Sequence, residues 1–90
     1  MAVYKLKAFA RFQRREKLDN AALCRAVREA NRGVVDADLG GGRIKQRIAR
    51  SGHGKSGGFR TLIAFQRGER AVFLFGFAKK DLGTAMGGTL

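Results

Sequence analysis

The amino-acid sequence predicts an α+β fold in which a helical hairpin packs on one face of a small antiparallel sheet. Between residues 8 and 33, apolar side chains recur at the spacing of amphipathic helices. Residues 43–50, 59–66 and 70–78 instead alternate, or run continuously apolar, over lengths typical of strands. A tight turn at residues 67–69 joins the last two of these strands as a hairpin.

The N-terminal third is expected to form one short strand and then the two helices. Residues 3–8 alternate as in a strand, after which Phe9, Phe12 and Leu18 fall near one helical face. Asp19 is a suitable N-cap for the second helix. That helix is expected to end at Gly33, because glycine readily takes the left-handed conformation that closes a helix.

Asp36 and Asp38 form a close pair of carboxylates in the segment 34–39. Such a pair can bind a metal ion or divide acid and base roles, but a third oxygen ligand is missing here. We therefore predict no metal site and expect the two side chains to cap the backbone or to pair with neighbouring arginines. The three glycines at 40–42 predict a flexible turn.

The strand at 43–50 divides its side chains by charge. Ile44, Gln46 and Ile48 share one face, so the cations between them share the other, and these are Arg43, Lys45 and Arg47. Like charges side by side on a pleated surface repel one another and cost stability unless an anion lies over them. This arrangement is the first indication of an anionic ligand.

A glycine-rich loop is expected at 51–58, between the cationic strand and two apolar strands. The last strand, 70–78, is apolar on both faces, which indicates a central strand covered on both sides. Strict alternation would place Phe73, Phe75 and Phe77 on the same face. Residues 83–90 are glycine-rich and are expected to form a flexible tail, so the predicted domain spans residues 1–82.

Composition and charge narrow the classes of function. The 90 residues suffice for one domain, and 44% hydrophobic residues with seven Phe argue against a disordered chain. The net charge of +12 is spread over the whole length, which favours a phosphate polymer as partner, ahead of an anionic membrane or an acidic protein. No apolar run is long enough to span a membrane and no signal peptide is evident, so we expect a cytoplasmic protein with no membrane partner. Cys24 is interpreted as a small helix residue.

The loop at 51–58 holds two candidate functional residues. Residues 49–56 fit a loose phosphate-loop pattern, but a strand follows where such a loop needs a helix, which argues against nucleotide binding. Lys55 can either reach over the mouth of the sheet or be a solvated lysine, and both alternatives stay open. Histidine has an unperturbed pKa near neutrality, so His53 could assist acid–base chemistry on RNA, although no carboxylate is evident to orient it.

Arg60 is the most informative single residue. It stands in a strand otherwise rich in Phe, Thr, Leu and Ile, where an arginine either extends to the rim of the sheet or points into a cleft. Beside Lys45, Arg47 and Lys55, a cleft position would make it a bidentate phosphate clamp.

These segments together resemble the RelE/ParE superfamily of toxins, in particular its HigB-like branch. The resemblance covers residues 3 to about 81 and rests on the glycines before the basic strand, that strand itself, GKSGGFRTL at 54–62 and FGFAKK at 75–80. It implies a RelE-like fold and cleavage of messenger RNA, usually on the ribosome, neutralised by a cognate antitoxin that we expect to be a helix-turn-helix protein. It also implies that neither a metal nor another cofactor is needed.

The resemblance also implies the roles of individual residues. Lys45 or Lys55 would deprotonate the 2'-hydroxyl, Arg47 and Arg60 would hold the phosphate, and Lys80 or His53 would assist the leaving group. Further contacts to RNA are expected from the remaining cations of the region, which are Arg43, Arg50, His53 and Lys79.

Two hypotheses from different classes follow. The first is a toxin endoribonuclease that inhibits translation. The second is a protein without catalytic activity, which either docks its basic face on RNA, ribosome or antitoxin, or inhibits DNA gyrase as ParE-like relatives do. Breaks in the RNA of expressing cells would favour the first.

Overall fold

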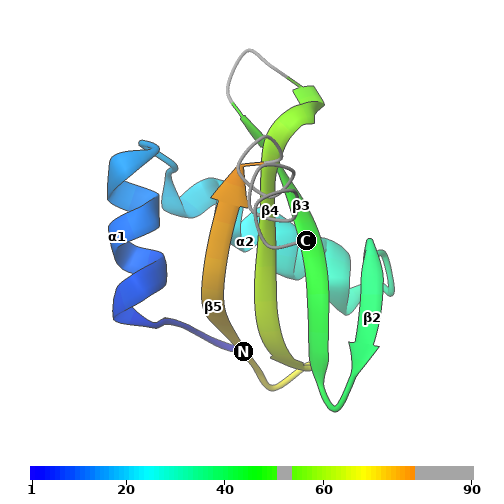
Figure 1. Ribbon diagram of the computed structural model, residues 1–90. Coiled ribbons are helices and arrows are strands. Elements are labelled where there is room, and N and C mark those ends of the chain that lie inside the picture. Colours follow the sequence, from blue (N-terminus) through cyan, green and yellow to red (C-terminus); the bar gives the residue numbers. More distant parts are fainter. Residues whose placement is uncertain (51–53, 79–90) are drawn as a thin grey trace, which may run out of the picture.

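A computed structural model describes residues 1–50 and 54–78 (Figure 1). Five strands form one sheet in the order β1-β5-β4-β3-β2, so the predicted α+β class is confirmed. The sheet is mixed, because β1 runs parallel to β5 while all other neighbours are antiparallel. The elements are β1 (Ala2–Lys5), α1 (Lys7–Arg15), α2 (Asn20–Asn31), β2 (Ala37–Gly40), β3 (Arg43–Arg50), β4 (Gly54–Gln66) and β5 (Arg70–Ala78).

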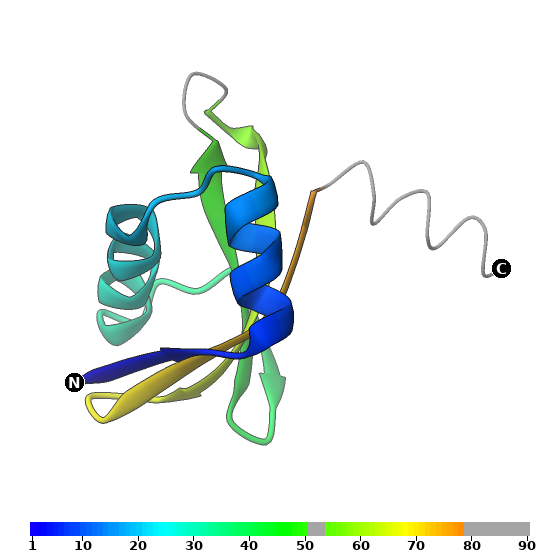
Figure 2. The same ribbon diagram turned by 90° about the vertical axis from the view of Figure 1, so that its left-hand side faces the viewer.

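Helix α2 begins and ends where the sequence predicts. The Asp19 carboxylate accepts a hydrogen bond of 2.9 Å from the backbone N–H of Ala22, which makes Asp19 the N-cap of α2. Gly33 follows the helix with a φ of +83°, as expected of the residue that closes it. Helix α1 packs against β5 and α2 against β3, so the helices cover one face of the sheet (Figure 2). In the described part of the chain, neither helix is long and apolar enough to cross a membrane.

The core lies between the helices and the sheet and is rich in aromatic rings. The Phe9 ring of α1 lies 4.9 Å from the Phe73 ring of β5, and Phe12 meets Phe59 edge to face at 5.3 Å. All four side chains are almost fully buried. Burial of each such side chain is worth about 1.5–3 kcal/mol, so the predicted apolar face of α1 holds that helix on the sheet.

A bulge divides β5 and overturns the prediction that Phe73, Phe75 and Phe77 share a face. Leu62 of β4 pairs with Phe75, but the next residue of β4 pairs with Phe73, so one residue of β5 is left over between them. Phe73 is therefore buried against the helices, whereas Phe75 is 53% exposed. Strict alternation cannot anticipate this change of face, because it assumes an unbroken ladder.

Gly76 explains why the bulge is tolerated. A Cβ at this position would lie 2.4 Å from two carbons of the Phe12 ring, so the ring of α1 packs directly on the glycine backbone. Gly76 thus takes the place on the helix-facing side that alternation would have given to a larger residue. Its neighbours Phe75 and Phe77 consequently point to the other side of the sheet.

Two predicted loops contain strand. β4 begins at Gly54, which pairs with Arg50 at the end of β3, and the register shifts before the next pair, Ile48 with Phe59. The prediction of a loop over residues 54–58 is wrong, because the strand extends through a glycine-rich stretch that has no strong preference of its own. Similarly, β2 forms at the sheet edge and reaches Gly40, the first of the three glycines predicted to form a flexible turn. The predicted tail at 83–90 lies outside the described residues.

Candidate functional site

The face of the sheet opposite the helices, called the outer face here, carries the cations of β3. Ile44, Gln46 and Ile48 are buried on the helix-facing side, as the alternation predicts. Arg43 and Arg47 are exposed and Lys45 is half-buried on the outer face.

Cross-strand pairing arranges the outer face in rows that run from β3 over β4 to β5. In one row Arg47 pairs with Arg60, which pairs with Phe77. In the next row Lys45 pairs with Leu62, which pairs with Phe75. Paired residues of neighbouring strands project to the same side of a sheet. The structure therefore brings Lys45, Arg47 and Arg60 together on one surface.

Arg60 has unused hydrogen-bonding capacity. Its Nη1 is buried, and it has no hydrogen-bond partner in the part of the chain that the structure describes. An unsatisfied buried donor costs about 1–3 kcal/mol, and more when the group is charged. A bound anion could accept this unused bond, because hydrogen bonds between guanidinium and anionic groups are among the stronger ones in proteins.

Arg47 has an internal partner, Asp36. The Asp36 carboxylate accepts a hydrogen bond from the backbone N–H of Arg47, and its Oδ1 lies 3.6 Å from Arg47 Nε. This confirms that Asp36 pairs with a neighbouring arginine, while Asp38 accepts a 2.9 Å bond from the backbone N–H of Gly40. The Arg47 and Asp36 side chains are 45% and 36% exposed, so the pair contributes about 1 kcal/mol or less.

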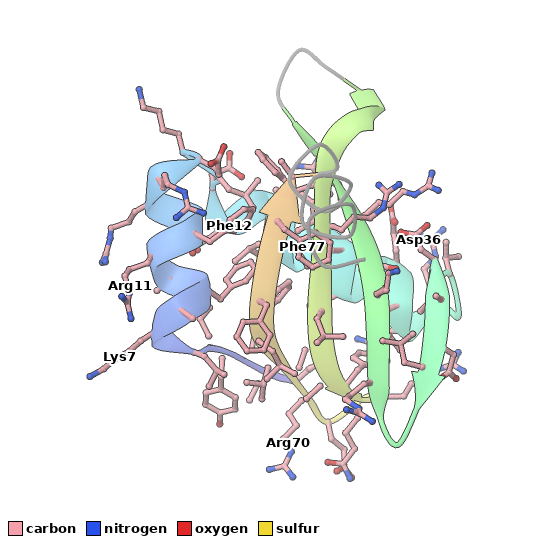
Figure 3. The ribbon with its side chains drawn as sticks, viewed as in Figure 1. Lys7, Arg11, Phe12, Asp36, Arg70 and Phe77 are labelled. Carbon is pink, nitrogen blue, oxygen red and sulfur yellow. The ribbon has the colours of Figure 1, made fainter. Side chains whose placement is uncertain are left out.

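Figure 3 shows the extent of the site across the sheet. Asp36 lies on the β2 side and Phe77 lies by β5, on the opposite side of β3 and β4. Lys45 and Arg60, between these limits, have no carboxylate within salt-bridge distance among residues 1–49 and 58–78. The same described residues include no group of three or more His, Cys, Asp or Glu that could hold a metal ion.

Other predicted site residues are only partly placed. Arg50 ends β3, and Lys55 is the second residue of β4, so Lys55 belongs to a strand and not to the expected loop. Their side chains lie outside the described residues, as do His53, Lys79 and Lys80 altogether. Roles assigned to these five residues stay predictions.

Sequence reasoning missed the aromatic part of the outer face. Phe75 and Phe77 were assigned to the same face as Phe73, and the bulge places them beside the cations instead. The available signal was Gly76, since a glycine inside an apolar strand often marks a bulge or the close approach of another group.

A family comparison agrees with this geometry. The family model described as RelE toxin of the RelE / RelB toxin-antitoxin system matches residues 1–85. The chain belongs to the RelE toxin family. It is thus the toxin of a toxin–antitoxin system, and the family implies an antitoxin as its partner. No curated protein matches the toxin closely enough to indicate a relative. The predicted superfamily is confirmed, and the HigB-like branch stays a prediction.

Proposed function

We propose that the toxin is a metal-independent endoribonuclease that cleaves messenger RNA on the ribosome and so inhibits translation. The observation that carries this proposal is the buried, unpartnered Nη1 of Arg60, located in a row with Arg47 and one row from Lys45. Three cations on one surface, one of them with an unused donor, suit a phosphodiester better than they suit a neutral ligand.

The proposed reaction is attack of a ribose 2'-oxygen on the adjacent phosphorus. The O–P bond that forms closes a 2',3'-cyclic phosphate, and the bond to the 5'-oxygen of the next nucleotide breaks. Lys45, or Lys55 in its place, first releases a proton to solvent and then, as the neutral amine, takes the proton of the 2'-hydroxyl, while Lys80 or His53 in its protonated form gives a proton to the leaving 5'-oxygen. The remaining cations, Arg43, Arg50 and Lys79, would guide the RNA backbone.

Arg60 and Arg47 would stabilise the extra negative charge on the phosphorane-like transition state. Donors that are fixed before the reaction need no reorganisation as the charge develops, and loss of one such donor typically lowers the rate about 100- to 1,000-fold. Arg60 fits this role because the residue is half-buried with its Nη1 buried, and because its position is set by pairing with both neighbouring strands.

The decisive test is substitution of Arg60→Ala. The variant is expected to abolish growth arrest on expression while keeping the fold, with cleavage of ribosome-bound messenger RNA lowered at least about 100-fold. Arg28→Ala is the matched control, since Arg28 is an exposed arginine on α2 and its removal changes the net charge equally. Unchanged toxicity of Arg60→Ala at normal protein levels would refute the assignment.

Primer extension separates cleavage from simple binding. RNA from cells that express the wild-type toxin should show discrete breaks at defined positions within codons, and Arg60→Ala should remove them. Growth arrest without breaks would instead indicate binding or inhibition of DNA gyrase. A parallel reaction with free messenger RNA tests the ribosome, because a ribosome-dependent enzyme leaves free RNA intact.

A further inference from the structure

Two phenylalanines on the outer face lie beside the cations without a role in the core. The rings that contact one another in the core belong to Phe9, Phe12, Phe59 and Phe73. Phe75 is 53% exposed and Phe77 is half-buried. An aromatic side chain left in contact with water loses most of the stabilisation that its burial would contribute. Packing among residues 1–50 and 54–78 therefore does not account for two aromatic residues at these positions.

The core itself holds these rings outward. Gly76 stands between them, and the Phe12 ring packs so closely on it that even a Cβ would lie at 2.4 Å. Because side chains alternate along a strand, the residues on either side of Gly76 must face away from α1. Phe75 and Phe77 thus have defined backbone positions on the outer face, which is a property of preorganised binding sites.

Each phenylalanine lies in a row with a cation. Phe77 is next to Arg60, and Phe75 is two strands from Lys45 in the neighbouring row. Adjacent strands are about 4.8 Å apart, so the backbone of each ring lies about 5–10 Å from that of its cation. This separation is comparable with the reach from a phosphate to the base of the same nucleotide.

The rows also repeat at a suitable interval. Consecutive residues on one face of a strand are about 6.7 Å apart, which resembles the spacing of successive phosphates along an extended single strand. A surface that offers a cation and an aromatic ring in each of two such rows matches a polynucleotide, which offers a phosphate and a base in each unit. A peptide segment would match the apolar rings but would leave the buried Nη1 of Arg60 unsatisfied unless it also carried an acid there.

We propose that Phe75 and Phe77 form a stacking surface for two successive bases of single-stranded RNA, one base on each ring, with their phosphates held by the cations of the same rows. The proposal rests on the proposed function and adds the residues that bind the bases. Stacking is tolerant of base identity, because every base presents a π-face. These two rings would therefore contribute affinity and position the sugar–phosphate backbone over Arg60 without selecting a particular base.

The test measures binding of a short, unstructured 2'-O-methyl oligoribonucleotide, which lacks the attacking hydroxyl, by fluorescence anisotropy. Phe75→Ala and Phe77→Ala are each expected to weaken binding about 5- to 100-fold. Phe75→Trp and Phe77→Trp should restore it, since an indole ring also stacks. Val34→Ala is the control, because Val34 is an exposed apolar residue that belongs to none of β3, β4 and β5.

Salt and an abasic nucleotide distinguish stacking from charge. The alanine variants should keep the wild-type dependence of binding on salt, whereas Arg60→Ala should reduce the slope by about 0.7. The wild type should bind an abasic oligonucleotide, which lacks the stacked base, more weakly than the intact one. Phe75→Ala or Phe77→Ala should bind the two oligonucleotides with nearly the same affinity.

Three results would overturn the stacking surface and leave the proposed function standing. One is unchanged binding by both alanine variants in a protein that cleaves RNA. The second is a loss of binding that is the same for the intact and the abasic oligonucleotide. The third is unchanged RNA binding by the alanine variants together with a loss of their neutralisation by the co-expressed antitoxin. That result would assign the rings to a protein partner.

By contrast, a wild-type toxin that neither binds nor cleaves RNA would overturn the proposed function itself.

Discussion

Gln46 and Arg60 stand on neighbouring strands of one sheet, but Gln46 faces the helices whereas Arg60 lies on the outer face. Gln46 is buried, and all of its polar atoms are used: its Nε2 donates to the carbonyls of Ala26 and Val34, and its Oε1 accepts from the N–H of Asp36. Arg60 in contrast keeps a buried nitrogen without a partner among the described residues.

The difference separates structural from functional polar groups. The buried side-chain amide of Gln46 joins α2, β3 and the segment before β2. It stabilises the fold, because it provides hydrogen-bond partners for backbone groups of these segments. A guanidinium nitrogen that is buried without a partner among the described residues adds no stability to the fold, which agrees with the phosphate-binding role proposed for Arg60.

Gln46→Leu should destabilise the toxin by about 3 kcal/mol. Leucine has a similar volume, but it removes the bonds that Nε2 donates to the carbonyls of Ala26 and Val34 and the bond that Oε1 accepts from the Asp36 N–H. Each buried polar group left unsatisfied costs about 1–3 kcal/mol. Thr61→Val is the graded control, because it removes only the 2.9 Å bond from Thr61 Oγ1 to the Gln46 carbonyl and should cost about 1 kcal/mol. Urea denaturation measures both. A loss below that of Thr61→Val would show that the Gln46 bonds are not structural.

Gly76→Ala should destabilise the toxin by about 1–3 kcal/mol, as overpacking of a core does. The added Cβ would meet the Phe12 ring at 2.4 Å, so the ring or the strand must move. The matched comparison is the same substitution in a Phe12→Ala background, where the obstructing ring is gone and Gly76→Ala should cost much less. Equal losses of stability in both backgrounds would mean that contact with the Phe12 ring is not the reason why position 76 requires glycine.

Arg60→Met, unlike the two preceding substitutions, should not destabilise the toxin. It should leave the free energy of unfolding unchanged or raise it by about 1 kcal/mol. Methionine keeps much of the apolar stem and removes the unpartnered nitrogen, whose burial is unfavourable. Thermal or urea unfolding measures stability, and the cleavage assay should show that activity is lost. A marked loss of stability would indicate that Arg60 supports the fold, and would weaken the assignment of its guanidinium to phosphate.

Asp36→Asn should change stability by less than about 1 kcal/mol, since the ion pair with Arg47 is partly exposed. Asparagine keeps an oxygen that can accept the bond from the Arg47 N–H. Its neutral side chain should release the Arg47 guanidinium for phosphate, so binding of a single-stranded oligoribonucleotide is expected to tighten a few-fold at low salt. Asp38→Asn is the control of equal charge, and an equal gain from it would attribute the effect to net charge alone.

The sequence by itself determined much of the framework. Asp19 and Gly33 set the two ends of α2, Asp19 by capping and Gly33 by its left-handed conformation. The alternation from Arg43 to Ile48 assigned cations and apolar residues to opposite faces of one strand. Such features depend on residues a few positions apart, so local physical chemistry is sufficient to predict them.

Only the tertiary structure decided which side chains share the outer face. The bulge in β5, the exposure of Phe75, the contact of Asp36 with Arg47 and the unpartnered nitrogen of Arg60 all depend on how β3, β4, β5 and α1 meet. Cross-strand register and the packing of Phe12 on Gly76 join residues that are far apart in the chain. No period within a single strand contains that information, because the extra residue of a bulge reverses every assignment that follows it.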